Sequence, residues 1–223
     1  MDILEELGSK PSISEENGLL KLRSTDNIIF SPGISTAGFA EIRMVKDNPD
    51  RKVIATTVDQ KGLEFANETI KKLGYEKQIE TRLEDLSKEW NYPENYFDFI
   101  YARLVLQYLS SQDLDKVLAW FYSSLKSGGL LFVVVRSVKN VSSKDQVIKF
   151  DSLTKMTTYK DGDMAGGIAI RYFHTPETMT VHMSKAGFIM NEIKEYKERL
   201  SKDFMRKKLS DDENHLIEVT CSK

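Results

Sequence analysis

Two carboxylates stand just after apolar segments of this sequence, in positions where they could hold a nucleotide-like ligand. Asp59 follows the segment 52–58, and Asp85 follows the segment 79–83. A carboxylate at a strand end can accept hydrogen bonds from both hydroxyls of a ribose, and another can accept from an adenine amino group. Each has an ordinary alternative, since Asp59 could be a solvated acid and Asp85 a turn or N-cap residue. The candidate binding residues here are Asp59, Gln60, Glu84, Asp85 and Leu86.

A loop of small residues follows the first short apolar segment, 28–30. It reads Ser-Pro-Gly-Ile-Ser-Thr-Ala-Gly over residues 31–38, before a segment of helical pattern. Such a loop lets the backbone approach a ligand at a helix N-terminus. Ser35 and Ala37 stand where such loops usually carry glycine, and Ser31 stands where a carboxylate is common. We predict a cofactor-binding turn whose contacts are Ser31, Gly33, Ser35 and Ala37.

Three residues are candidates for acting on a substrate. Arg103 could anchor a carboxylate or phosphate, or it could pair with a nearby acid at a helix start. Tyr108 could line a substrate pocket or be an ordinary half-buried tyrosine. His174 is the best-placed general base, but it directly precedes a helix N-cap, which favours a structural role. The sequence therefore identifies no catalytic residue, and the weak candidates are His174, Arg103 and Tyr108.

The elements that must position these residues alternate between strands and helices. Strands are expected at 28–30, 52–58, 79–83, 96–102 and 130–135, and helices at 38–46, 62–73 and 114–125. A short helical segment, 19–22, precedes the first strand. This alternation predicts an α/β fold with a parallel sheet covered by helices on both faces. Ligands of such sheets bind beyond the carboxyl ends of the strands.

The rest of the chain changes character. Residues 137–168 are polar and read as irregular. The elements expected after them are a helix at 175–185 and strands at 187–193 and 215–220. We predict one domain over residues 1–223, with an N-terminal segment 1–27 and an insertion 137–172 on the substrate side.

Composition excludes several classes of function. The chain of 223 residues has a formal net charge of −2, and 40% of its residues are hydrophobic, as in a folded globule. No basic field exists to hold nucleic acid, because acidic residues interrupt even the lysine-rich run 194–208, which we interpret as a solvated helix face or loop. The single cysteine, Cys221, and three scattered histidines predict neither a disulfide framework nor a metal site.

The sequence also limits the cellular location and the binding partners that we expect for this protein. No apolar stretch reaches the roughly 20 residues that span a bilayer, and the N-terminus lacks the apolar core of a secretory signal. We therefore expect a cytoplasmic protein, monomeric or homodimeric, that binds no membrane, nucleic acid or metal. A small-molecule substrate is the partner that fits, since no basic groove or recognition module is visible.

Several stretches, through their order and spacing, resemble the class I S-adenosylmethionine-dependent methyltransferases, chiefly their small-molecule branch. The most specific stretch is 95–109, which resembles the family's fourth strand and the leucine-rich turn after it. The other stretches that resemble the family are 19–29, 58–66, 125–132, 171–177 and 185–188. The resemblance implies a three-layer αβα sandwich. Its seven-stranded, mostly parallel sheet would have the order 3-2-1-4-5-7-6, with strand 7 antiparallel.

The resemblance also implies S-adenosylmethionine as cofactor. Its methionine end would lie over the loop 31–38, its ribose on Asp59, and its adenine beside Asp85 and Leu86. The positions that complete the implied cofactor site are Ala102 and Arg103, at the end of the fourth strand. Methyl transfer is an in-line displacement that needs aligned reactants above all, and a base only where the acceptor must lose a proton.

Three functions stay open. The first is an active methyltransferase acting on a small molecule. The second is a methyltransferase-fold protein with weak or lost cofactor binding that acts as a binding or regulatory partner, because the first loop departs from the family pattern. Asp at residue 31 and Gly at residue 35 would restore that pattern and are expected to tighten binding. The third is a nicotinamide-dependent reductase, suggested by the glycines at 33 and 38 and by the pair Tyr122 and Lys126, although that pair is expected at the wrong end of the sheet.

Overall fold

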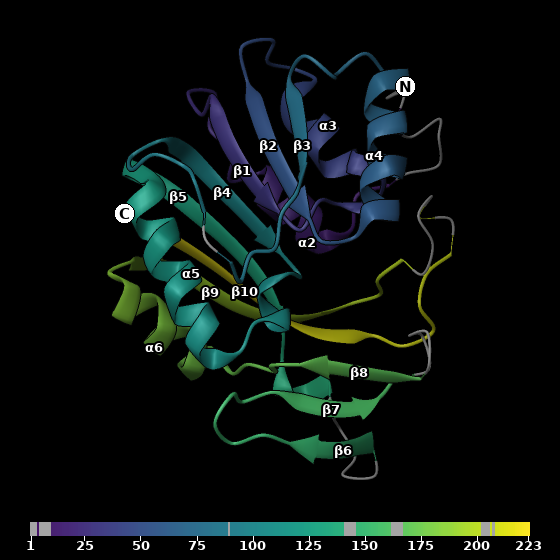
Figure 1. The fold of residues 1–223 in the computed structure, drawn as a ribbon, viewed down its shortest axis with the longest axis vertical. Helices are drawn as coiled ribbons and strands as arrows, with labels where there is room; N and C mark the ends of the chain where they lie inside the picture. The colour runs from purple at the N-terminus through teal and green to yellow at the C-terminus, as the bar shows by residue number, and fades with distance from the viewer. Residues whose placement is uncertain are drawn as a thin grey trace.

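The computed structural model describes residues 4, 10–88, 90–140, 146–161, 167–201, 206 and 208–223. One large sheet has seven strands in the order β3-β2-β1-β4-β5-β10-β9 (Figure 1). Its strands are β1 (Ile28–Pro32), β2 (Lys52–Thr57), β3 (Ile79–Leu83), β4 (Phe97–Arg103), β5 (Leu125–Arg136), β9 (Ile189–Glu198) and β10 (Asn214–Ser222). The first five are parallel, and β10 is antiparallel to both of its neighbours. Because β9 and β10 come sixth and seventh in this sheet along the chain, the predicted order and the antiparallel seventh strand are confirmed.

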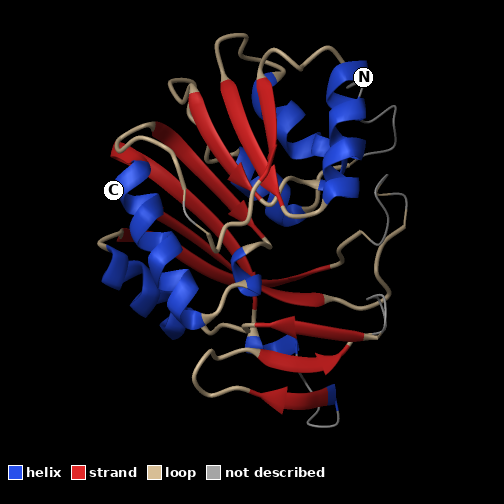
Figure 2. Ribbon diagram, in the orientation of Figure 1, coloured by secondary structure: helices blue, strands red, loops and turns tan. Residues whose placement is uncertain are grey.

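Helices cover both faces of the large sheet, which gives three layers (Figure 2). On one face lie α2 (Ile13–Leu19), α3 (Phe39–Val45) and α4 (Gln60–Lys72), and on the other α5 (Ser111–Ser124) and α6 (Pro176–Ala186). Each face has its own hydrophobic cluster between helices and sheet. The predicted αβα sandwich is therefore confirmed. No helix in the described part of the chain is long and apolar enough to cross a membrane.

The central strand β5 is longer than predicted. Residues 131–135 are all buried, as expected for a strand covered on both faces. Pairing with β4 already begins at Leu125, opposite Phe97, directly after the end of α5. The expected turn before this strand is instead its irregular first part, where the register against β4 shifts.

The N-terminal helix lies earlier in the chain than predicted. α2 ends at Leu19, and residues 20–22 form turns and a loop. Gly18 allows α2 to lie very close to the sheet, because a Cβ on it would be 2.4 Å from the ring of Tyr101 and 2.6 Å from that of Phe132. A glycine near the end of this short helix thus brings the N-terminal segment onto β4 and β5.

The insertion forms a second sheet where an irregular segment was expected. Its strands β6 (Val147–Phe150), β7 (Thr157–Lys160) and β8 (Ile168–Arg171) pair in antiparallel fashion. Burial alternates along β7 and β8, so a period of two is present. This alternation is hard to recognise in the sequence, because few apolar residues form the small core under these strands. β9 likewise extends beyond the predicted 193, because an edge strand tolerates charged side chains.

Candidate functional site

The carboxyl ends of β1, β2, β3 and β4 bring the predicted loops to one edge of the large sheet. The four strands are parallel and closely in register, with Pro32 opposite Thr56 and Thr57 opposite Leu83. Along this edge lie the loop after β1, Asp59, the segment 84–86, Ala102 and Arg103. The strand order alone therefore collects the residues predicted to bind the cofactor.

The loop after β1 contains a buried carboxylate that was not predicted. Glu41, on α3, is fully buried and accepts a hydrogen bond from the Ser31 hydroxyl at 2.7 Å. It also accepts from the Ser35 N–H at 3.2 Å and from the Ser35 hydroxyl. The acid that is missing at residue 31 is thus supplied from ten residues further along. Its only sequence signal is a charged residue on the buried side of a mostly apolar helix.

The backbone of the same loop is bonded within the protein. The N–H groups of Gly33 and Ile34 both donate to the Thr56 carbonyl, each at 2.8 Å. Gly33 has a φ of +75°, and a Cβ on it would lie 2.8 Å from Val105, so glycine is required there. Ala37, at one of the usual glycine positions, has a φ of 58°, which costs about 1 kcal/mol for a residue with a side chain. The loop keeps the backbone shape of a glycine turn while its sequence departs from one.

Asp59 caps the helix that follows β2. Its carboxylate accepts a hydrogen bond from the Lys61 N–H at 3.1 Å, and the residue is exposed. The carboxylate is therefore fixed in orientation and still accessible to a ligand, as the predicted ribose contact requires. Gln60 beside it is also exposed, and its amide donates to Glu64, one turn along α4, at 2.7 Å.

The two carboxylates of the segment after β3 accept hydrogen bonds from residues that follow them closely in the chain. Asp85 accepts from the N–H of Ser87 at 2.9 Å and from its hydroxyl at 2.7 Å, and these bonds lower the pKa of Asp85. Glu84 accepts from the Tyr92 hydroxyl at 2.7 Å, and Leu86 is buried in the core. The structure thus gives Asp85 its alternative role as a turn residue, and its contact with an adenine stays a prediction.

Arg103, at the end of β4, is bound by the N-terminal helix. Its guanidinium donates to the hydroxyls of Ser12 at 2.6 Å and Ser14 at 2.7 Å. Glu198 of β9 lies 3.7 Å from the same guanidinium and accepts a hydrogen bond from the Ser14 N–H at 3.0 Å. The alternative of an arginine paired with an acid is therefore present, but the acid comes from a distant strand. The side chain of Arg103 is still 15% exposed.

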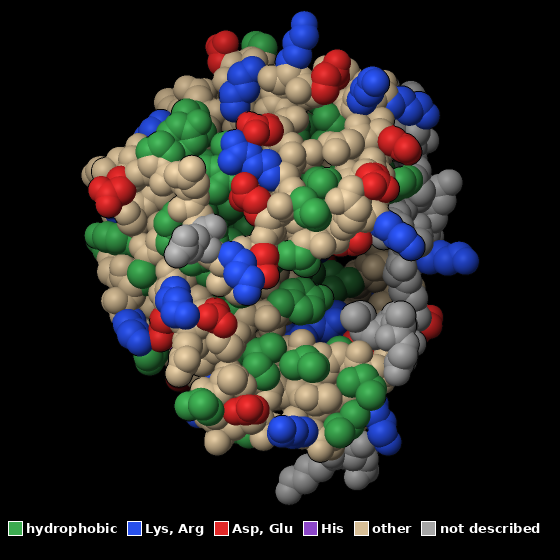
Figure 3. Space-filling model, in the orientation of Figure 1, with side chains coloured by type: hydrophobic (Ala, Val, Ile, Leu, Met, Phe, Trp, Pro, Cys, Tyr) green, Lys and Arg blue, Asp and Glu red, His purple; other side chains and the backbone are tan. Residues whose placement is uncertain are grey.

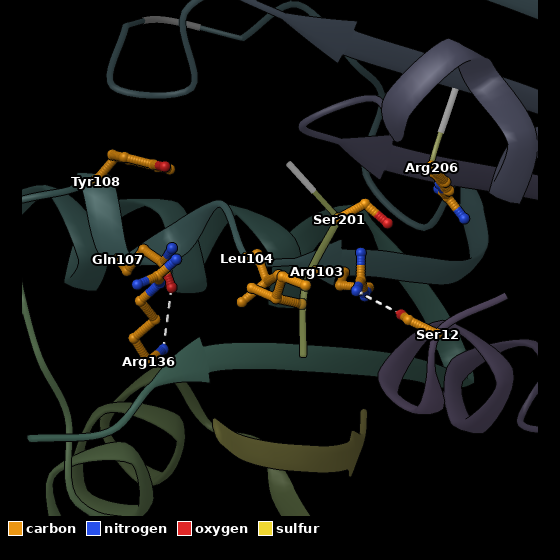
Figure 4. A pocket seen from close by; sticks show the side chains of 9 residues that line it. Ser12, Arg103, Leu104, Gln107, Tyr108, Arg136, Ser201 and Arg206 are labelled. Atoms are coloured by element: carbon orange, nitrogen blue, oxygen red, sulfur yellow. Dashed lines mark hydrogen bonds between the residues drawn. The ribbon is translucent and has the colours of Figure 1, made fainter. Parts of the chain in front are cut away.

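A pocket opens beside Arg103, between α2, the ends of β4 and β5, and the segment after β9 (Figure 4). Figure 3 shows the molecule hollowed on this face, with Lys or Arg side chains next to hydrophobic ones. Residues that line the pocket include Ser12, Arg103, Gln107, Tyr108, Arg136 and Arg206. Arg206 belongs to the lysine-rich run interpreted as solvated, and no sequence signal would have placed it here.

The other two catalytic candidates differ in access. Tyr108 is 53% exposed, lines the pocket and lies under the guanidinium of Arg171, 5.5 Å from its ring centroid. His174 is fully buried, and neither ring nitrogen has a hydrogen-bond partner among the described residues. Burial, with a smaller effect of nearby His182, lowers the pKa of His174 to about 3. The structure thus brings Tyr108 and Arg103 together and leaves His174 packed in the interior.

The pair that suggested a reductase lies elsewhere. Lys126 pairs with Asp98 at 2.7 Å, near the amino end of β4. Tyr122 packs edge-on against Phe188, with ring centroids 5.3 Å apart. Both residues are at the opposite end of the large sheet from the loop after β1, as their sequence positions predicted.

Comparison with known proteins now adds to this geometry. Residues 33–129 match a family model described as a methyltransferase domain, and a comparison with curated proteins finds no match. A structure of an S-adenosylmethionine-dependent methyltransferase from Methanosarcina mazei has a TM-score of 0.71 at 13% identity, covering 93% of this chain and 95% of that one. One from Mesorhizobium loti has a TM-score of 0.65 at 15% identity, covering 97% and 100%. Geranyl diphosphate methyltransferase, in complex with GPP and sinefungin, has a TM-score of 0.64 at 13% identity, covering 93% and 76%. At such identities the structural likeness establishes the fold.

Proposed function

We propose that the chain transfers a methyl group from S-adenosylmethionine to a small-molecule acceptor, because residues 33–129 match a methyltransferase-domain model and the whole chain has the fold of the methyltransferases compared above. One observation carries the proposal. The loop after β1 and the exposed Asp59 share a sheet edge with the pocket beside Arg103. A donor and an acceptor bound at these two places would meet near the end of β4.

The residues of this edge fit the cofactor. When bound, S-adenosylmethionine supplies an electrophilic methyl group on a sulfonium. Asp59 would accept hydrogen bonds from the ribose hydroxyls, because its carboxylate is exposed at the end of β2. Glu41 accepts hydrogen bonds from the hydroxyls of Ser31 and Ser35, and these bonds hold the loop after β1 in its observed conformation. Arg103 and α2 would form the wall that orients an acceptor. Such alignment of two reactants can lower the activation free energy by about 7–11 kcal/mol.

The test is calorimetric titration of the full chain with S-adenosylmethionine and with S-adenosylhomocysteine. Both are expected to bind, and Asp59→Asn should weaken binding about tenfold, since asparagine keeps the N-cap but loses the charge. Glu68→Gln, on the exposed side of α4, is the matched control and should bind as the wild type does. No heat and no thermal shift at about millimolar cofactor would reject the enzyme.

A second function is favoured by the closed loop after β1. The N–H groups of Gly33, Ile34 and Ser35 donate to acceptors within the protein. This supports a methyltransferase-fold protein with weak or lost cofactor binding that acts as a binding or regulatory partner. A folded chain that gives no signal in the same titration would select this second function.

A further inference from the structure

The outer edge of the second sheet is an exposed, mostly apolar strand. β6 is the outermost strand, on the side away from the large sheet, and no strand among the described residues pairs with its outer edge (Figure 1). Ile148 and Phe150 of β6 are 51% and 56% exposed. The other edge strand, β8, meets the body of the molecule, because Tyr172 directly after it donates from its N–H to the Gln107 carbonyl at 2.8 Å. The second sheet therefore has one open edge, at β6.

The edges of the large sheet differ from β6 in charge. β3 carries Glu80 and Arg82, and β9 carries Glu192, Lys194 and further charged residues. Charged side chains on an edge strand hinder its pairing with another chain. β6 reads Val-Ile-Lys-Phe, with Lys149 as its one charged residue. The open edge of β6 thus has little of the protection that the other two edges have.

The backbone groups of Phe150 point toward this open edge. Asp151 donates from its N–H to the Met156 carbonyl at 2.9 Å, so these two residues form a hydrogen-bonded pair between β6 and β7. Phe150 lies opposite Thr157, one position along the ladder. Hydrogen-bonded and non-hydrogen-bonded pairs alternate in an antiparallel ladder. The N–H and C=O of Phe150 are therefore not used toward β7 and can bond to another strand.

We propose that a second copy of this chain pairs with the open edge of β6 in antiparallel fashion, about a two-fold axis at Phe150. The two second sheets would then form one continuous sheet, and each Phe150 would exchange two backbone hydrogen bonds with the partner's Phe150. The two rings, each 56% exposed in the single chain, would meet as a cross-strand aromatic pair. This inference goes beyond the proposed function and does not depend on methyl transfer.

Charge selects this register and identifies the partner as a second copy. A two-fold axis at Lys149 would place two lysines directly opposite each other, and one at Asp151 would place two aspartates opposite. Like charges in such positions destabilise a pair of strands. With the axis at Phe150, Lys149 of each copy lies opposite Asp151 of the other, which gives two pairs of opposite charge. The edge is therefore complementary to itself in this one register.

Asp151 keeps its charge although it belongs to a turn. Its carboxylate accepts hydrogen bonds from the N–H groups of Thr154 at 3.0 Å and Leu153 at 2.9 Å. These bonds lower the pKa of Asp151, so the carboxylate is ionised at neutral pH. Lys149 is exposed on the strand beside it. Both charges that the register requires are thus present at the edge.

The first experiment is sedimentation equilibrium of the full chain at about 1 to 100 μM. The wild type should reach the mass of a dimer. Phe150→Pro removes an N–H that points away from β7, so it blocks pairing at the edge and leaves the bonds between β6 and β7 intact. It should weaken the dimer at least about tenfold, while circular dichroism and the thermal unfolding temperature show that the variant is folded.

The second experiment reverses the charges. Lys149→Glu and Asp151→Lys each place like charges opposite each other at both pairs of a homodimer, so each variant alone should dimerise about tenfold more weakly than the wild type. In an equimolar mixture the two variants restore opposite charges at both pairs, and a heterodimer as tight as the wild-type dimer should form. Lys160→Glu makes the same charge change on the exposed part of β7 and should leave the wild-type dimer unchanged.

Three outcomes would overturn the proposal. The first is a wild type that stays monomeric at about 100 μM. The second is a wild-type dimer that Phe150→Pro and both charge variants leave intact, since this would place the interface elsewhere. The third is a pair of folded charge variants that stay monomeric when mixed, because the register about Phe150 requires them to complement each other.

Discussion

The carboxylate in the loop after β1 comes from Glu41 and not from residue 31. Ser31 and Ser35 both bond to it, so their hydroxyls are suited to the acid that α3 provides. The sequence expectation that Asp at residue 31 tightens cofactor binding has to be revised for this reason. A second carboxylate at residue 31 would meet a buried one, and like charges at such distances cannot both stay ionised.

Ser31→Asp should therefore lower the free energy of unfolding by about 3 kcal/mol, and it should weaken cofactor binding. The double variant Ser31→Asp with Glu41→Gln should recover most of the stability and most of the cofactor binding, because it keeps one carboxylate and one neutral partner. Urea unfolding and cofactor titration measure the two effects. A single variant that is as stable as the wild type and binds more tightly would show that Glu41 does not serve this loop.

The buried ring of His174 leads to a second prediction, which concerns how the free energy of unfolding depends on pH. Burial lowers its pKa from 6.5 to about 3, so the folded chain binds fewer protons than the unfolded chain between these values. The stability that neutral His174 permits is complete above pH 6.5 and is lost as the pH falls towards 3. The loss should reach about 3 kcal/mol near pH 4.

His174→Phe should flatten this part of the pH dependence, since it removes the titrating ring and keeps an aromatic side chain against Tyr172. Urea unfolding at about pH 7 and about pH 4 gives the difference. His215→Phe, at the partly buried start of β10, is the control. Equal slopes for His174→Phe and the wild type would contradict the prediction.

At the scale of elements, α5 and α6 are joined by one acid. Asp115 accepts from His182 Nδ1 and from Lys185 Nζ, each at 2.6 Å. Burial tends to raise the pKa of Asp115, but these two bonds outweigh it and lower the pKa. The bridge holds the later helix against the one that follows β4.

Asp115→Asn should cost about 1–2 kcal/mol of stability, because it weakens two charge-assisted bonds at once. Lys116→Gln breaks an exposed pair on the same helix, with Asp113, and should cost less than about 0.5 kcal/mol. Chemical unfolding compares the two variants. A cost for Asp115→Asn no larger than that of the control would mean that packing alone joins the helices.

The predictability of the elements follows the strength of their pattern. β5 contains a continuous run of apolar residues and α4 has apolar residues at helical spacing, so both were predicted. Only the ends of these two elements differ from the prediction. The second sheet was missed because β7 and β8 alternate with few apolar residues, and α2 was misplaced because its packing depends on Gly18. At the site, Asp59 could be predicted from its strand end. Glu41 and Arg206 could not, because their roles depend on partners that only the fold brings near.

At the scale of the whole molecule, the pocket is built by both ends of the chain. Glu198 on β9 holds α2 through Ser14, and Asn17 of the same helix donates to Glu218 on β10 at 2.8 Å. The wall of the pocket beside Arg103 therefore depends on β9 and β10 as well as on β4 and β5.

Glu198→Gln should loosen α2, with faster amide hydrogen exchange over residues 13–19 and a loss of about 1–2 kcal/mol of global stability. Glu192→Gln on the same strand is the control, since Glu192 is a surface residue, 37% exposed, that pairs with Lys21. Protection of α2 that is unchanged in Glu198→Gln would show that Gly18 packing is enough to hold the helix.

This arrangement also fixes the order in which a newly made chain can complete the loop after β1 and the pocket beside Arg103. The loop after β1 and Asp59 need only β1, β2 and the helices beside them, which are close in sequence. α2 is made early, but its partners Glu198 and Glu218 lie 184 and 201 residues from the groups they bond. Closing such long loops is slow and comes late in folding. A nascent chain that has reached β5 therefore has the loop after β1 and Asp59 in place, while the pocket beside Arg103 is completed only when β9 and β10 have been made.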